Sequence, residues 1–167
     1  MLERFAAWKS RQRRSLPPGD SSATPQEIYA DLMKVAFAPA LRASGLRGSG
    51  GRFELPSARY WAQLGFQKSV HNGGDEMRFT VNVSVVSRDE WARQSAAHPR
   101  LGKRPSPQMD YGEWAQPTRI GELTPEGIDK WWRILRGSDG EAVRDDVLHD
   151  LLTYAVPWLK RKAEDPD

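Results

Sequence analysis

The three histidines are the residues of this sequence best suited to acid–base or metal chemistry, and their spacing forms no recognised motif. His71, His98 and His149 lie far apart, with no HExxH or HxH pair. A metal site needs several His, Cys, Asp or Glu ligands that converge. The chain contains no cysteine, which excludes thiolate nucleophiles and Cys-ligated metals. We therefore assign no catalytic residue, no metal ligand and no cofactor.

The closest approach to a ligand set is an acidic stretch near the C-terminus. Asp145, Asp146 and His149 share one side of a predicted helix, opposite its leucines. A solvated helix face has the same pattern, and we expect one here. The four glycines between residues 45 and 51 are not followed by the Lys-Ser/Thr helix start of a phosphate-binding loop. A flexible connection is expected there.

One face of the predicted sheet combines an aromatic ring with polar side chains, as recognition surfaces do. By strand alternation, Trp61 points away from Leu64 and Phe66. The face carries Trp61, Gln63, Gln67, Arg78, Thr80, Asn82 and Ser84. These residues form a candidate binding surface. The alternative is a face that is merely solvated, with Trp61 covered by a long loop or by a helix.

The N-terminal arm holds most of the excess positive charge. Its basic residues are Arg4, Lys9, Arg11, Arg13 and Arg14. With one glutamate they give the first 14 residues +4, while the whole chain has +3. The arm could bind nucleic-acid phosphates or an acidic partner, but a solubilising terminus is favoured, because aromatic residues for base stacking are limited to Phe5 and Trp8. If residues 4–14 form a helix, these two rings should dock on the domain.

Residues 1–23 are predicted to comprise this arm and a Pro/Ser-rich linker, and residues 24–167 are predicted to form a single domain. Thr24-Pro25-Gln26-Glu27 combines an N-cap hydroxyl, a proline at the first helical position and a glutamate suited to a capping box. We expect a helix from Thr24 to Gly45, with a kink at Pro39.

Between residues 52 and 86, apolar residues recur at every second position instead of at helical spacing. This alternation predicts antiparallel strands. Strands at 60–67 and 78–86 follow a shorter one at 52–55. Their apolar face comprises Tyr60, Ala62, Leu64, Phe66, Phe79, Val81, Val83 and Val85. If the hairpin turn is Asn72-Gly73, Phe66 pairs with Phe79. If the turn lies one residue later, each residue pairs with a partner two positions further along, and the assignment of side chains to the two sheet faces is unchanged.

The C-terminal half is predicted to be mainly helical. A short helix should follow Ser87, and 97–118 is a long irregular stretch of the kind that is either functional or disordered. Residues 119–123 are predicted as a fourth strand, and a helix capped by Thr124-Pro125 should bury Ile128, Trp131, Trp132 and Leu135 before Gly137. A last helix is expected over 139–154, interrupted by Pro157.

These elements predict an α+β fold: an antiparallel meander of three to four strands with helices packed on one face. No apolar run is long enough to span a bilayer, and no signal-peptide core follows the N-terminal basic residues. With no cysteine for a disulfide framework, we expect a cytoplasmic protein.

Several short motifs, taken in order, resemble a bacterial family known as domain of unknown function 4304. They are Leu41-Arg42-Ala43-Ser44-Gly45-Leu46, Phe66-Gln67-Lys68-Ser69, Phe79-Thr80-Val81-Asn82-Val83, Arg119-Ile120-Gly121 and Trp131-Trp132. The resemblance covers roughly residues 25–160. The chain departs from the family at Leu46, where an aromatic is usual, and in its arm and linker. The resemblance implies a small α+β domain with no assigned activity and no catalytic residue to carry over.

The resulting hypothesis is a binding module that is not an enzyme and whose partner is another protein, adaptor- or immunity-like by analogy only. It rests on the polar face around Trp61 and the missing catalytic motifs. Two alternatives stay open: nucleic-acid binding through the arm, and a small-molecule enzyme or ligand-binding domain that uses the sheet face and the 97–118 loop.

Overall fold

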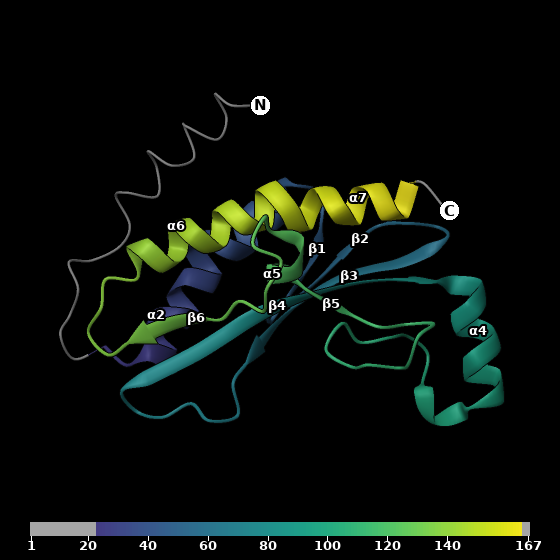
Figure 1. The fold of residues 1–167 in the computed structure, drawn as a ribbon, viewed down its shortest axis with the longest axis horizontal. Coiled ribbons are helices and arrows are strands. Elements are labelled where there is room, and N and C mark those ends of the chain that lie inside the picture. The colour runs from purple at the N-terminus through teal and green to yellow at the C-terminus, as the bar shows by residue number, and fades with distance from the viewer. Residues whose placement is uncertain (1–22, 165–167) are drawn as a thin grey trace.

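The fold is α+β, with a six-stranded antiparallel sheet in the described residues (Figure 1). The computed structural model describes residues 23–164. The helical elements are α2 (Pro25–Leu32), η1 (Met33–Phe37), α3 (Ala38–Ala43), α4 (Arg88–Ala97), η2 (Pro99–Leu101), α5 (Ile120–Leu123), α6 (Glu141–Asp150), η3 (Leu151–Ala155) and α7 (Val156–Glu164). The strands are β1 (Arg47–Ser49), β2 (Arg52–Leu55), β3 (Tyr60–Lys68), β4 (Glu76–Ser87), β5 (Thr118–Arg119) and β6 (Trp132–Leu135).

The first helix begins where the sequence predicts. The Thr24 hydroxyl accepts a hydrogen bond from the Glu27 main-chain N–H, and the Glu27 carboxylate accepts one from the Thr24 N–H, which completes the capping box. At Pro39, where the sequence predicts a kink, the π-helical turn η1 ends two residues earlier and the helix continues through the proline as α3. Gly45, at a φ of 97°, follows its end.

The expected interruption at Pro157 is wrong, because α6, η3 and α7 run on as one long helix (Figure 1). A proline inside a helix lacks the N–H for its hydrogen bond, and its ring clashes with the carbonyl four residues earlier. The π-helical turn η3 ends two residues before Pro157, as η1 ends two residues before Pro39. A widened turn therefore accommodates each proline without ending the helix.

The sheet has the order β1-β2-β3-β4-β5, with β6 pairing with β4 beside β5. Phe66 lies opposite Val81 and Leu64 opposite Val83. This is the register of a hairpin closed one residue later than Asn72-Gly73, so the face assignment holds. Its apolar face contacts α2–α3 and α6–α7: Ala62, Leu64, Phe66, Phe79, Val81 and Val83 are buried, and Tyr60 and Val85 are half-buried.

Two short strands replace elements that the sequence predicts differently. The glycine-containing stretch expected to be a flexible connection forms β1, which pairs with β2 as a hairpin. The expected strand over 119–123 is strand only at Thr118–Arg119 and then becomes the short helix α5. Both β1 and β5 exist because they hydrogen-bond to a neighbouring strand. The sequence of a segment does not show which strand it will pair with.

The helix predicted after Thr124-Pro125 is also wrong. Residues 132–135 form β6, in which Trp132 and Ile134 are buried while Arg133 and Leu135 are exposed. This alternation of period two fits a strand as well as the paired tryptophans fit a helix stripe. Ile128, expected in the core, is exposed.

The sheet separates two apolar clusters. The larger one lies between the apolar face of the sheet and the helices α2–α3 and α6–α7. The smaller one gathers Trp91 of α4 with Tyr111 and Trp114 of the irregular stretch. α4 and this stretch lie on the side of the sheet opposite α6 and α7 (Figure 1). Within residues 23–164, no helix has the length and apolar character needed to cross a membrane.

Candidate functional site

The polar sheet face predicted as a binding surface is largely covered by the chain itself. Gln63, Thr80, Asn82 and Ser84 are buried. Trp61 and Gln67 are half-buried, and Arg78 is exposed. The sequence leaves open a binding surface or a solvated face, and the structure shows neither, because four of the seven side chains are buried. The seven residues therefore do not form one accessible surface.

The irregular stretch is ordered against this face and supplies most of the cover. A Cβ on Gly65 would lie 2.8 Å from the Pro107 ring, so the glycine lets the loop approach the strand. The Gln108 side-chain amide donates to the Phe66 carbonyl over 2.6 Å. These contacts fix residues 104–108 across the middle of β3.

Trp61 contacts two guanidinium groups, that of Arg104 in the same loop and that of Arg88 at the start of α4. The Arg88 guanidinium lies 3.7 Å from the centre of the Trp61 ring, and that of Arg104 lies 5.0 Å away. Both arginines also pair with the Glu54 carboxylate. The indole is thus a stacking platform for side chains of this protein.

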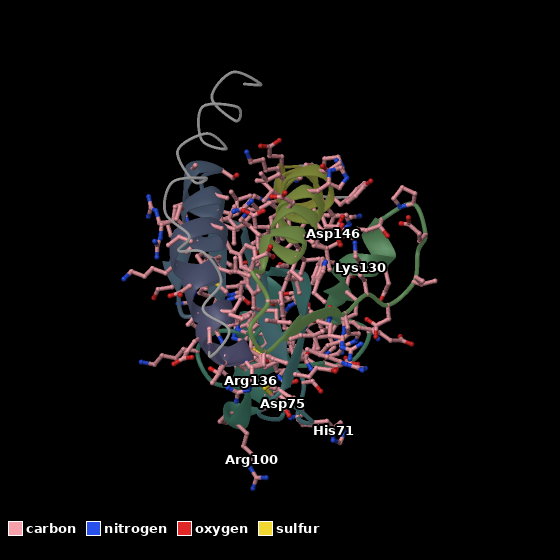
Figure 2. All side chains as sticks on the ribbon, turned by 90° about the vertical axis from the view of Figure 1, so that its left-hand side faces the viewer. His71, Asp75, Arg100, Lys130, Arg136 and Asp146 are labelled. Atoms are coloured by element: carbon pink, nitrogen blue, oxygen red, sulfur yellow. The ribbon has the colours of Figure 1, made fainter. Side chains whose placement is uncertain are left out.

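The acidic stretch of α6 pairs with a lysine instead of forming a metal site. The Lys130 ammonium lies 2.9 Å from Asp146 and 2.6 Å from Asp150, and the Trp132 indole donates to Asp146 over 2.8 Å (Figure 2). These contacts tie the segment before β6 to the long helix. In residues 23–164, no group of three or more His, Asp or Glu side chains is placed to hold a metal ion.

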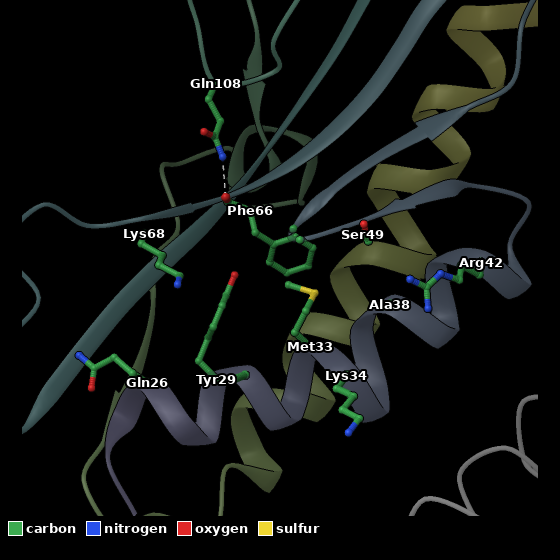
Figure 3. Close-up of a pocket in the computed structure, with 13 residues that line it drawn as sticks. Gln26, Tyr29, Met33, Lys34, Ala38, Arg42, Ser49, Phe66, Lys68 and Gln108 are labelled. Carbon is green, nitrogen blue, oxygen red and sulfur yellow. Dashed lines mark hydrogen bonds between the residues drawn. The ribbon is translucent and has the colours of Figure 1, made fainter.

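The candidate functional site is a groove on the helix side of the sheet, which we call the basic groove (Figure 3). It has a volume of about 650 Å³, in the range of protein ligand sites. One wall comes from α2, η1 and α3, and the other from the β1–β2 turn and the end of β3. The lining residues are Gln26, Tyr29, Ala30, Met33, Lys34, Ala38, Arg42, Ser49, Gly50, Gly51, Phe66, Lys68 and Gln108.

The charged residues of the basic groove are all cations. Lys34, Arg42 and Lys68 line it, and no described acidic residue does. The Arg42 guanidinium donates to the Gly48 carbonyl from two nitrogens, at 2.9 and 3.3 Å. Lys34 is exposed and forms no ion pair with a described residue. The groove therefore has an uncompensated positive potential that attracts anionic groups.

The floor of the basic groove is aromatic and apolar. Tyr29, Met33 and Phe66 project into it (Figure 3). The Lys68 ammonium lies 5.0 Å from the centre of the Tyr29 ring, which itself packs edge-on against Phe79. Burial raises the pKa of the Tyr29 hydroxyl above its ordinary value, so this group stays protonated and can donate a hydrogen bond. The groove thus offers apolar contact area beneath a cationic rim.

The edge of β3 beside the basic groove has no neighbouring strand. β2 pairs with β3 only from Ala62 to Gly65. The Phe66 N–H then bonds to the Gly51 carbonyl, and the Ser69 N–H bonds to Arg78 on the β4 side. By strand alternation, the main-chain groups of Lys68 face the uncovered edge, where no described residue bonds to its N–H. Because the Phe66 carbonyl already accepts from Gln108, an added extended segment would bond to this edge at Lys68.

The sequence contains only part of the signal for this groove. Lys34, Ala38 and Arg42 are spaced four residues apart, which places them on one helix face. Nothing local shows that Lys68 and the β1–β2 turn come to the same place, since that depends on how the sheet packs on the helix. The basic arm, with Arg4, Lys9, Arg11, Arg13 and Arg14, lies outside the described residues, as do Phe5 and Trp8. Nucleic-acid binding through the arm stays a prediction.

The comparison with protein families identifies one match. The profile of DUF4304, a domain of unknown function, matches residues 37–161, more than two thirds of the 167 residues. No curated protein and no solved structure gave a match. The match begins at the end of η1 and includes α3 and the whole sheet, so it contains Arg42, Phe66 and Lys68 of the basic groove but not Tyr29, Met33 or Lys34.

Proposed function

The chain belongs to the DUF4304 family, and we propose that in this member the basic groove binds an acidic, extended segment of a partner protein. The observation that carries the proposal is the set of three cations, unopposed by any described acid, beside the strand edge at Lys68. An extended peptide that adds to such an edge gains main-chain hydrogen bonds, while its side chains enter flanking pockets.

The chemistry of the groove favours a peptide over other anions. Lys34, Arg42 and Lys68 can pair with carboxylates, and the Tyr29, Met33 and Phe66 floor suits an apolar side chain of the same segment. Methionine adapts its shape to different partners, which is useful in a groove of this kind. A cytoplasmic location, in keeping with this role, remains a prediction from the sequence.

Fluorescence anisotropy with a labelled octapeptide of alternating glutamate and leucine tests the proposal on the full chain. Lys34→Glu and Lys68→Glu replace attraction by repulsion at exposed positions, so each should weaken binding about tenfold or more, whereas Lys160→Glu on α7 serves as the matched control. We expect the control to bind within about twofold of the wild-type protein, because Lys160 lies outside the groove.

Two results would contradict the proposal. One is equal weakening by all three charge reversals, which would indicate attraction by net charge alone. The other is displacement of the peptide by an equal concentration of single-stranded DNA, which would favour a nucleic-acid ligand.

A further inference from the structure

We propose that a second pocket, which we call the loop pocket, binds a small phosphate monoester with a hydroxyl-bearing body, such as a sugar phosphate. It lies across the sheet from the basic groove, between the β1–β2 hairpin and the loop residues Arg104–Pro107, with a volume of about 520 Å³. Proline rings from the loop form one wall, and the polar face of the sheet forms the other.

The mouth of the loop pocket presents two unpaired guanidinium groups. Arg47 lies opposite Glu54, and Arg52 lies opposite Ser49, so the two arginines are diagonal neighbours on adjacent strands. Both line the pocket, and neither forms an ion pair with a described residue. Guanidinium groups bind phosphate oxygens through paired, charge-assisted hydrogen bonds.

The third arginine of the loop pocket is held in place by this protein. Arg104 pairs with Glu54 and lies over the Trp61 ring. Three arginines against one glutamate leave the lining with an excess of two positive charges, which a phosphate dianion would neutralise. The fixed Arg104 closes the side of the pocket opposite the strands.

The inner end of the loop pocket contains a buried polar group that lacks a partner. Gln63 lines the pocket and is 6% exposed, yet its side-chain oxygen accepts no hydrogen bond. Ser84 lies opposite Gln63 on β4, and its buried hydroxyl is also without a partner. Unsatisfied buried polar groups are costly and rare in folded proteins. A hydroxyl group of a bound ligand would donate to the Gln63 oxygen and remove this cost.

Charge and polarity together orient the ligand. The row Arg47, Glu54, Gln63 and Ser84 crosses four adjacent strands from the exposed hairpin to the covered interior. The phosphate therefore belongs at the arginines of the mouth, and the hydroxyl-bearing part belongs at Gln63.

Isothermal titration calorimetry with ribose 5-phosphate and with inorganic phosphate tests this inference on the full chain. We expect ribose 5-phosphate to bind, and Arg52→Gln to weaken it about tenfold or more, because a charge-assisted phosphate contact is lost. Gln63→Met should weaken ribose 5-phosphate and leave inorganic phosphate unchanged. Arg100→Gln is the matched control, since Arg100 projects into solvent at the far end of the loop (Figure 2).

Circular dichroism and thermal unfolding establish that each variant is folded. We expect Arg52→Gln to fold, because Arg52 is exposed. The inference is overturned if millimolar ribose 5-phosphate gives no binding heat, or if Arg100→Gln weakens binding as much as Arg52→Gln. Binding of a phosphoserine peptide without binding of ribose 5-phosphate would also overturn it. The basic-groove proposal is independent of all three results, because its variants and its probe differ.

Discussion

Gln63 and Asn82 both lie on the covered polar face, but only Asn82 has a hydrogen-bond partner. Its amide donates to the Gln67 side-chain oxygen over 2.8 Å, whereas the Gln63 oxygen accepts no bond. Removing a buried partner costs about 1–3 kcal/mol, while replacing an unsatisfied group by an apolar one of similar shape is nearly neutral. We therefore expect Asn82→Ala to lower the free energy of unfolding by about 1–3 kcal/mol, and Gln63→Met to change it by less than about 1 kcal/mol.

Urea denaturation measures both differences, with Leu64→Ala as the reference for a core cavity, expected to cost about 2–5 kcal/mol. Equal losses for Asn82→Ala and Gln63→Met would show that the two amides are equivalently satisfied, against the hydrogen bonding described above.

Asp146 gives the protein a specific acid sensitivity. Partial burial alone would raise the pKa of its carboxyl, but hydrogen bonds from Lys130 and Trp132 and the lysine charge outweigh burial and hold that pKa below its ordinary value. The contribution of Asp146 is thus fully present above the unfolded-state pKa of about 3.9 and is lost as pH falls through the lower folded-state value.

Denaturation followed between about pH 5 and pH 2.5 should therefore show a shallower loss of stability for Asp146→Asn than for the wild-type protein. Asp31→Asn, at an exposed position of α2, is the control and should keep the wild-type slope. If the free energy of unfolding of Asp146→Asn fell with pH as steeply as that of the wild-type protein, Asp146 would not contribute to the acid sensitivity.

At the scale of elements, the loop and β3 fit together through Gly65. A Cβ there would meet the Pro107 ring at 2.8 Å, whereas a Cβ on Gly73 would have nothing within 4 Å. Gly65→Ala should force the loop outward at a cost of about 1–3 kcal/mol. Amide hydrogen exchange should become faster in the loop, with little change in Gly73→Ala. Unchanged exchange in both variants would mean that the loop does not depend on this approach.

The sequence predicts helices and strands well where neighbouring residues determine them, and less well where pairing with a distant strand determines them. The capping box at Thr24 and the face alternation of β3 and β4 are set by neighbouring residues, and both are confirmed. The tryptophan pair before Arg133 fits a helix or a strand equally, and the edge of β4 selects the strand. The register shift of the hairpin and the continuity of the helix past Pro157 likewise depend on three-dimensional accommodation.

At the scale of the whole molecule, the chain covers its polar sheet face and leaves a cationic groove open on the helix side. Trp61, the residue that most suggested a recognition surface, stacks on Arg88 and Arg104 of the same chain. Strand alternation predicts which residues share a sheet face. It does not predict whether that face is exposed, because the loop that covers it lies about 40 positions away along the chain. The open strand edge at Lys68 likewise becomes visible only when the extent of β2 is known.

The most direct test of the account is amide hydrogen exchange at Lys68, followed by NMR during titration with the alternating glutamate–leucine octapeptide. In the free protein this N–H faces the uncovered edge of β3 with no partner among residues 23–164, so it should exchange rapidly. Strand addition gives it a main-chain acceptor, and we predict slowing of about tenfold or more at saturation. Saturable binding that leaves the exchange of Lys68 unchanged, with the largest shifts in the N-terminal arm, would contradict the account.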